Sequence, residues 1–499
     1  MRNTRSTAVP ATTSIHATTA APAIPAAPAP APASEPDAGT TAVPGASRRG
    51  TGRSVLPAAA AAALLLPLAG CGSASAGDGS TVTVTVGYQS KTINTVTAGT
   101  LLRSLGYFER DLKALGKQDG KTYKVVWQDY PTGAPITAQM TAGKIDIGSM
   151  GDYPLLINAA RGTELRHPTR LVSVTGYNLR GGLNTVVTAP GSTIGSLAGL
   201  RGKNVSTSVG SAADGTLVRA LRRAGIDPDK DIHKLNQEPA VGASALSSGS
   251  ADALSQFVAW PGLLVWQDKA KALYDGAELN VPTFHGVTAV QDFAKQRPKV
   301  LNAFLRAQNE ATTYLNDHPV AAAERVGKAA GLPPEVVYLY NGAGGVATFD
   351  PTIKPRLVAA LKEDVAVLRS AGLVGNVDVD AFVDDHCLRT VLGRDYARRA
   401  AAAPAPARSE AWPKGAGETR AFDSPKALLG YVAHHAHAIR AAYVPDASTG
   451  TLWFANKAVW VADSGDLKAF VAPSTAHAYI AEHPGARTVS YARALERAS

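Results

Sequence analysis

The sequence contains few residues of the types that build cross-linked or thiolate sites. Only two cysteines, Cys71 and Cys387, occur in 499 residues, and no Cys-x-x-Cys pair is present. A disulfide framework and a paired-thiolate zinc or redox site are therefore excluded. If Cys71 serves another purpose, Cys387 is left as a single thiol in "DDHCLRTVLG", where packing is favoured over a nucleophilic role.

Charged residues are also scarce, at 18% of the chain, while the net charge is +10 and the pI is about 9.4. An excess of positive charge can indicate binding to nucleic acid or anionic lipid. Here the Arg and Lys residues are scattered and often stand near acids, as in "RALRRAGIDPDKD", and no basic stripe alternates with aromatic residues. The sequence therefore predicts no nucleic-acid binding.

Catalytic signatures are missing from the main body. It has no GxSxG, no HExxH, no phosphate-binding loop and no paired His/Cys arrangement. We therefore expect a protein that is not an enzyme and needs no cofactor.

The apolar run at the N-terminal side is too short for a membrane helix. Residues 1–46 are Ala, Pro and Thr with few large apolar groups, which predicts a disordered extension. A basic cluster, "SRRGTGRS", precedes sixteen mostly apolar residues, Val55 to Gly70, which two prolines interrupt. About 20 residues are needed to span a bilayer, so this pattern predicts a secretory signal peptide.

The apolar run ends in "LAGC", Leu68 to Cys71, which resembles the lipobox of bacterial lipoproteins. The resemblance implies a signal peptide over residues 47–71, lipid on the Cys71 thiol, and a flexible Gly/Ser tether over residues 72–80. The protein would then be held at the extracytoplasmic face of a membrane. An apolar segment that merely ends in Cys is the alternative. The choice between Sec and Tat export stays open, as does the true start codon, which we place nearer Val43.

The main body alternates strand and helix patterns. "TVTVTVGYQ" alternates Val with polar residues and predicts a strand, and "AGTLLRSLGYFERDLKALG" has helical spacing that ends in Gly. The alternation continues to "IDIGSMGDYPLLINAARG" and restarts after Leu183, which predicts two α/β lobes in series. From Thr288 to about Tyr396 the pattern is nearly all helical.

An ordered set of segments in this body resembles the substrate-binding proteins of nitrate, taurine and alkanesulfonate ABC transporters. The resemblance implies a two-lobed periplasmic-binding-protein fold of the second type over residues 81–395. Lobe 1 would comprise about 81–185 and 281–395, lobe 2 about 186–280, and the ligand would lie between them. The segments that carry the resemblance are "VGYQ", "AGKIDIGSMGDYPLLINAARG", "SLAGLRGKNVSTSVGSAADGTLVRALRRAGI", "SSGSADALSQFVAWPGLL" and "VTAVQDFAKQRPKVLNAFLRAQNEATTYLNDHP".

The candidate ligand residues follow predicted strands, because ligands of open α/β sheets lie beyond the carboxyl ends of strands and at helix N-termini. "VGSAADGTL" begins a helix whose free N–H groups suit an anion, although simple capping by Ser208 or Ser211 is the alternative. Asp152 equally suits a helix cap, and Trp260 suits a core position as well as an apolar wall of the cleft. Arg180 suits a counter-charge to the ligand and, equally, a solvated loop. The predicted ligand-binding residues are Gln89, Ser90, Gly151, Asp152, Tyr153, Gly210, Ser211, Ala212, Ala213 and Trp260.

The tail divides into an Ala/Pro-rich segment, 396–421, which predicts a linker, and a small α+β domain, 422–499. Segments such as "LKAFVAPSTAHAYIAEHPGARTVSYARAL" resemble the NosL family of copper-accessory lipoproteins, which implies a copper site. This domain has no Met or Cys, the soft ligands that suit Cu(I). The remaining candidate ligands are His434, His437 and His477; the alternative is a solvated His-rich helix.

Together these patterns predict a lipid-anchored, monomeric substrate-binding component of an ABC importer. It would capture a small anion of the sulfonate, taurine or nitrate kind and deliver it to membrane permease subunits. One alternative is an enzyme on the same fold that makes or uses a small heterocycle. Its mark would be a buried Lys, His or Cys in the cleft, and the motif segments hold none. Another alternative is a metal-delivery lipoprotein dominated by the C-terminal domain.

Overall fold

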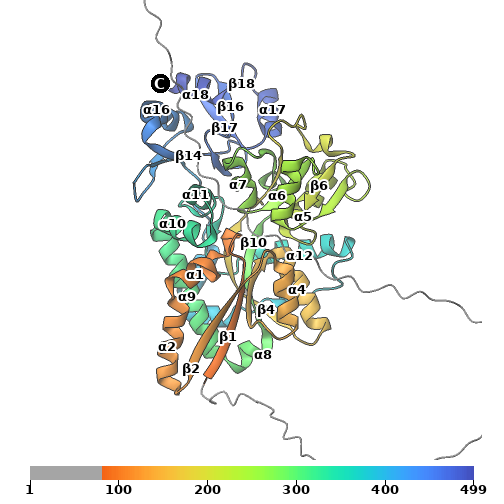
Figure 1. The fold of residues 1–499 in the computed structure, drawn as a ribbon, viewed down its shortest axis with the longest axis vertical. Coiled ribbons are helices and arrows are strands. Elements are labelled where there is room, and N and C mark those ends of the chain that lie inside the picture. Colours follow the sequence, from red (N-terminus) through yellow and green to blue (C-terminus); the bar gives the residue numbers. More distant parts are fainter. Residues whose placement is uncertain (1–80) are drawn as a thin grey trace, which may run out of the picture. The chain divides into compact units, whose positions relative to one another are not determined.

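The computed structural model describes residues 81–499, which form two α/β lobes and a C-terminal module (Figure 1). The predicted extension, signal peptide and tether lie outside the described residues, as does Cys71. Among the helices of residues 81–499, none combines the length and apolarity needed to cross a membrane.

The first lobe is built on a six-stranded sheet of order β11-β4-β10-β3-β1-β2. β1 runs parallel to β2 and β3, whereas β10 is inserted antiparallel between β3 and β4. The alternating Val residues of β1 put one side of that strand into the core, as the period of two predicts. The strands are β1 (Thr81–Tyr88), β2 (Thr122–Asp129), β3 (Ile147–Gly151), β4 (Thr169–Asn178), β10 (Thr283–Val290) and β11 (Thr348–Phe349).

Helices cover both faces of this sheet. Phe108 of α2 meets Phe304 of α9 edge to face, with 5.2 Å between ring centroids, in the core on one face. α3, α4 and α12 pack in a second core on the other face. The N-terminal helices are η1 (Ile93–Ala98), α1 (Thr100–Leu105), α2 (Tyr107–Asp119), α3 (Gly133–Thr141) and α4 (Asp152–Glu164). The later ones are α8 (Gln291–Gln296), α9 (Pro298–Asp317), α10 (Pro319–Ala330), α11 (Pro334–Asn341), α12 (Pro355–Ser370), α13 (Val379–Phe382), α14 (His386–Leu392) and α15 (Asp395–Ala401).

The second lobe is built on a five-stranded sheet of order β7-β6-β8-β5-β9, with its own core around Leu217 and Leu221. Its strands are β5 (Asn184–Thr188), β6 (Asn204–Thr207), β7 (His233–Asn236), β8 (Ala253–Phe257) and β9 (Lys271–Asp275). Its helices are η2 (Leu197–Leu200), α5 (Ala212–Arg223), α6 (Pro239–Ser248), α7 (Trp260–Trp266) and η3 (Gly276–Leu279). Within residues 81–499 the chain passes between the lobes twice, at 179–183 and at 276–282. The predicted two-lobed fold is confirmed, with the predicted boundaries close to these crossovers.

One predicted helix of the first lobe is two helices. The segment after Ala98 was expected to be continuous, but Gly106, at φ +69°, ends α1 and begins α2. A left-handed backbone conformation of this kind favours glycine and stops the helical hydrogen-bond ladder.

The C-terminal module, residues 409–499, contains two small antiparallel sheets. Their orders are β13-β12-β14-β15 and β17-β16-β18. The strands are β12 (Ser409–Pro413), β13 (Arg420–Phe422), β14 (Ile439–Pro445), β15 (Leu452–Phe454), β16 (Val459–Asp463), β17 (Asp466–Phe470) and β18 (Arg487–Val489). The helices are α16 (Pro425–His435), η4 (Ala436–Ala438), α17 (Pro473–Glu482) and α18 (Tyr491–Ala498).

The prediction of a linker over 396–421 is wrong. β12 is an inner strand that pairs with both β13 and β14, and Trp412 within it is fully buried. The next helix, α16, follows Ser424, whose side chain caps it by accepting the N–H of Ala427. It ends at His435, because Ile439–Pro445 form β14 between β12 and β15.

Candidate functional site

A cavity of about 500 Å³ lies between the two lobes. Lobe 1 contributes residues 132–135, Gly151 and His285 to its wall, and lobe 2 contributes 208–212 and 236–238. Gly151 ends β3, and other lining positions directly follow β1, β6 and β7, which places the cavity at the carboxyl ends of strands, as the sequence predicts.

Four helices begin at the wall of this cavity. The N-cap residues of α3, α4, α5 and α6 are Thr132, Gly151, Ser211 and Glu238, and all four line it. In α3, α4 and α6 the N-cap side chain makes no capping hydrogen bond. A helix N-terminus carries partial positive charge and N–H groups without intrahelical partners. The wall therefore presents the starts of helices in place of cationic side chains.

At the N-terminus of α5, side chains of the protein itself accept hydrogen bonds from the backbone N–H groups. Ser211 accepts a hydrogen bond from the Asp214 N–H, and Asp214 Oδ2 accepts one from the Gly210 N–H. Asp214 also pairs with Lys234 at 3.3 Å. Both sequence interpretations, capping and a place in the cleft, therefore hold for Ser211.

Cationic side chains do not form the wall. Of the described residues that line the cavity, none is Lys or Arg. Glu238 is the carboxylate of the wall and is exposed to solvent. An anion bound in the cavity would rely on helix N-termini and neutral hydrogen-bond donors, while Glu238 would repel it from the side of α6.

His285 of β10 is the ionisable group that sequence reasoning missed. It lies opposite Gly151 in the sheet, is 3% exposed and lines the cavity. Its Nδ1 is within hydrogen-bond distance of Asn94 Nδ2; when Asn94 donates, Nε2 carries the ring proton. Burial lowers the pKa of His285 to about 3, so the ring is neutral near pH 7.

The cleft thus holds a buried His, the mark expected of the enzyme alternative, although the motif segments themselves contain none. His285 stands two residues before the segment that resembles the transporter family, so the motif did not include it. The signal available in the sequence was its place in a strand-like run, "PTFHGVTAV".

A smaller cavity of about 260 Å³ adjoins the first and shares Glu238 with it. Ser90, Lys91, Tyr130 and Trp260 line this outer space, and the Lys91 ammonium lies 5.8 Å from the Trp260 ring centroid. Trp260 thus forms a wall next to the main cavity, together with Tyr130. The outer space offers aromatic surface and charges of both signs.

The predicted ligand residues divide into three groups. The structure places Gln89, Gly151, Gly210, Ser211 and Ala212 on the main cavity. It places Ser90 and Trp260 on the outer one. Asp152, Tyr153 and Ala213 line neither. That any of them binds a ligand stays a prediction.

Asp152 and Tyr153 make contacts away from both cavities. Asp152 is fully buried and accepts hydrogen bonds from the N–H groups of Tyr153 and Phe284, while burial raises its pKa. The Tyr153 hydroxyl accepts a hydrogen bond from Arg219, which also donates to Asp364 at 2.9 Å. Arg219 belongs to lobe 2, so these side chains connect the lobes directly.

The predicted metal ligands do not come together. Within residues 81–499, no group of three or more His, Cys, Asp or Glu side chains is arranged to hold a metal ion. His434 is the penultimate residue of α16, His437 lies beyond this helix in η4, and His477 is on α17. His434 and His437 do not lie on one helix, because α16 ends at His435, between them. Copper binding stays a prediction, and so does the likeness to NosL.

The two lobes with a cavity between them have the fold of the two-lobed periplasmic binding proteins. A solved structure of the alkanesulfonate-binding protein SsuA from Xanthomonas axonopodis pv. citri bound to MOPS has the same fold, with a TM-score of 0.51 and 21% sequence identity. The match covers 60% of this chain and 98% of that one.

Residues 124–322 match the model of the family described as "NMT1/THI5 like". A putative aliphatic sulfonates-binding protein of Escherichia coli is 27% identical over 245 residues, which is 49% of this chain and 74% of that protein. The taurine-binding periplasmic protein of the same organism is 24% identical over 45% of this chain and 68% of its own. A putative thiamine biosynthesis protein of Haemophilus influenzae is 29% identical over 36% and 54%. The predicted relationship to ABC-transporter substrate-binding proteins is confirmed for this body.

Proposed function

We propose that this protein is the lipid-anchored substrate-binding component of an ABC importer. Cys71 carries the anchor, and the cavity between the lobes captures a small anion of the sulfonate, taurine or nitrate kind. The protein then delivers the solute to permease subunits in the membrane.

The convergence of four helix N-termini on one cavity carries this proposal. Sulfonates are compact oxyanions, and backbone N–H groups at helix starts bind such groups well. His285 adds a neutral N–H donor in the buried wall. The names of the relatives that bind aliphatic sulfonates and taurine support the same class of ligand.

Thermal-shift and calorimetric titration of the full chain test the ligand class. Taurine, MOPS, short alkanesulfonates and nitrate form the panel. A ligand at 100 times its Kd stabilises the folded state by about 2.7 kcal/mol, which raises the melting temperature by several degrees. Binding of a neutral compound, with no response to any anion, would overturn the proposed ligand class.

A pair of histidine variants links binding to the cavity. His285→Leu removes the N–H donor, and we expect affinity for the anion to fall by about tenfold, since a hydrogen bond to a charged group contributes about 1.5 kcal/mol or more. His386→Leu is the matched control, because His386 is exposed on α14. Equal affinities in both variants would contradict a role for His285 in binding.

An enzyme that acts on a small heterocycle is the second candidate. The buried His285 and the thiamine-biosynthesis relative favour it. Incubation of the protein with pyrimidine precursors, followed by mass spectrometry, separates the two functions. Unchanged compound that co-purifies with the protein supports binding, whereas product that disappears in His285→Leu supports catalysis.

A further inference from the structure

The two crossovers between the lobes lie side by side. Gly181 of the first crossover has a φ of +106°, and a Cβ at this position would lie 2.8 Å from Gly276 O and 2.9 Å from Val281 O of the second. Asn178 Oδ1 holds the first crossover by accepting three backbone hydrogen bonds, from residues 180–182. A change in the angle between the lobes has to occur at these segments.

A loop of the C-terminal module lies directly on this hinge. Thr449 Oγ1 donates a hydrogen bond of 2.9 Å to Asp275 Oδ2, where β9 ends and the second crossover begins. Thr451 Oγ1 lies 3.1 Å from the place of a Cβ on Gly182 in the first crossover. Asp446 fixes the loop by accepting the N–H groups of Ser448 and Thr449. One loop therefore touches both connections between the lobes.

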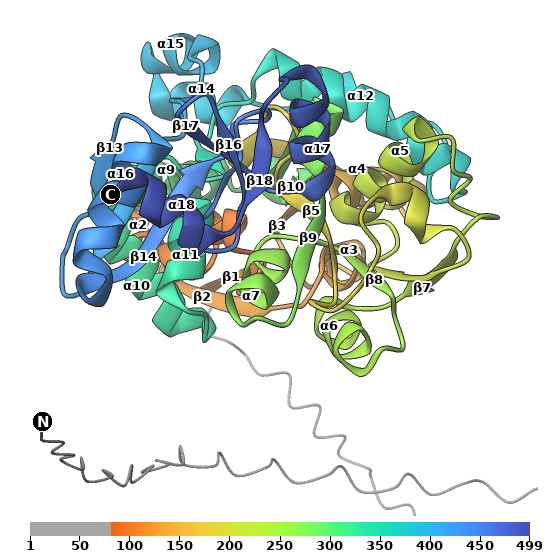
Figure 2. The ribbon, with the colours of Figure 1, turned by 90° about the horizontal axis from the view of Figure 1, so that it is seen from above.

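The module also packs on lobe 2. The rings of Phe454 and Trp266 are 5.0 Å apart, and Lys457 forms an ion pair with Asp268 at 2.5 Å. α17 lies against β9, the edge strand of the lobe 2 sheet. Viewed from above, the dark blue helix α17 of the module lies next to β9 (Figure 2).

The module also contacts the first lobe, through α11. Tyr338 donates a hydrogen bond of 2.6 Å to Glu410, and the Arg440 guanidinium bonds Glu335 at 2.5 Å. α11 is in turn bound to lobe 1, because Asn341 donates to the Ile93 carbonyl of η1 at 2.9 Å. The module thus connects lobe 2 to a helix that is part of lobe 1, through one continuous apolar core.

A second set of contacts flanks the crossovers. Tyr153, Arg219 and Asp364 border a small cavity together with Gly181 and Gly276. The Tyr153 ring lies against α5 so closely that a Cβ on Gly215 would be 2.0 Å from it. Rotation of lobe 2 would have to disturb these contacts as well as those of the module.

We infer that the C-terminal module is a hinge clamp, which holds the two lobes at a single angle and keeps the cleft preformed. Rotation of the lobes would separate Thr449 from the buried Asp275 or open the aromatic core around Phe454. Both losses oppose rotation, since a buried carboxylate without its partner is unfavourable and the core has no space to rearrange. The inference goes beyond the proposed function, because it does not depend on which ligand binds.

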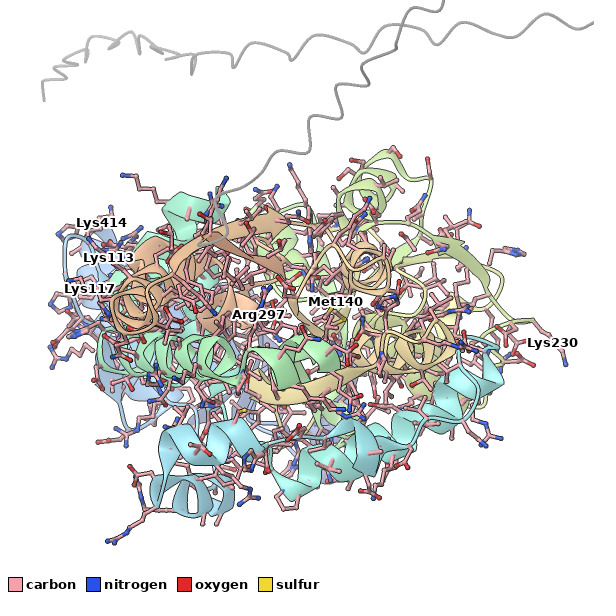
Figure 3. All side chains as sticks on the ribbon, turned by 90° about the horizontal axis from the view of Figure 1, so that it is seen from below. Lys113, Lys117, Met140, Lys230, Arg297 and Lys414 are labelled. Atoms are coloured by element: carbon pink, nitrogen blue, oxygen red, sulfur yellow. The ribbon has the colours of Figure 1, made fainter. Side chains whose placement is uncertain are left out.

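Distance measurement between spin labels in the ligand-free full chain tests the clamp. The labels are placed at Lys117→Cys on α2 and Lys230→Cys in lobe 2, in a Cys71→Ser, Cys387→Ser background. Both lysines point into solvent at well-separated edges of the two lobes (Figure 3). We expect one narrow distance distribution. Two populations in this protein would overturn the inference.

A variant in which contacts of the module are removed, here called the loosened variant, gives a second test by the same distance measurement. Thr449→Ala combined with Arg440→Gln removes the hydrogen bond to Asp275 and the ion pair with Glu335, and we expect the distribution to broaden by about twofold. Arg497→Gln, on the exposed side of α18, is the control and should leave the distribution unchanged. A loosened variant that keeps native circular dichroism and the original narrow distribution would also overturn the clamp. If the variant fails to fold, the number of populations in the intact protein still decides.

Discussion

The cleft and the hinge side of the molecule join the same two lobes by different means. At the cleft the lobes border a cavity of about 500 Å³ whose wall is formed by helix starts and one neutral histidine. At the hinge the module fills the space with buried Trp412, Trp453 and Phe454. The cavity offers space and hydrogen-bond donors to a ligand, whereas the close packing at the hinge opposes motion of the lobes. The comparison teaches that affinity and rigidity have separate origins in this chain.

The largest expected effect is that of removing Trp412. Its ring is fully buried, lies 5.4 Å from Tyr338, and has the Arg440 guanidinium 4.2 Å from its centre. Trp412→Ala should lower the free energy of unfolding by about 3 to 5 kcal/mol, measured by urea denaturation. The control is Trp260→Ala at the outer cavity, which should cost clearly less because that ring is only partly buried. Equal costs would remove the difference between the two regions.

An intermediate effect is expected where the lobes touch beside the hinge. Gly215→Ala places a methyl group against the Tyr153 ring, and overpacking of this kind costs up to about 3 kcal/mol. In a Tyr153→Ala background the same substitution should be nearly neutral, which a double-mutant cycle measures. Gly191→Ala, in open space, is the control. A large cost of Gly215→Ala in both backgrounds would show that the contact with Tyr153 is not its cause.

The smallest of the three expected effects is the contribution of His285, in the cleft, to the pH dependence of stability. Burial lowers the pKa of His285 to about 3, so below pH 6.5 the unfolded chain binds a proton that the folded chain does not. Stability conferred by the neutral ring is therefore complete above about pH 6.5 and is lost as pH falls towards 3.

The comparison is made with His285→Gln, which does not titrate. Between pH 7.5 and 5 the wild type should lose about 2 kcal/mol more than the variant, at about 1.4 kcal/mol per pH unit. Parallel stability curves for the two proteins would show that the imidazole is not buried in its neutral form.

The sequence predicted the lobes well because their signals are local. The period of two in β1 and the helical spacing of α5 lie within short windows, and both elements occur where expected. The starts of α4 and α5 identified Gly151 and Ser211 as residues of the cleft. These positions follow strands in the chain itself, so no knowledge of distant segments was needed.

The failures concern contacts between segments far apart in sequence. β12 is only five residues long, and composition alone makes its surroundings resemble a linker. Its burial depends on β14, about 30 residues later, and on α11. His285 was missed for the same reason, since β10 joins β3 only after the whole of lobe 2 has intervened.

The insertion of β10 between β3 and β4 also has a consequence for the order in which the chain can fold. All five strands of lobe 2 lie between Asn184 and Asp275. The sheet of lobe 1, in contrast, has a gap at its centre until residues 283–290 arrive. The lobe that begins second in the chain can therefore complete its sheet first, and β3 and β4 must wait as unpaired edges. Because this long loop has to close, lobe 1 should fold more slowly than lobe 2. Its strands are also more exposed to mispairing until the sheet is complete.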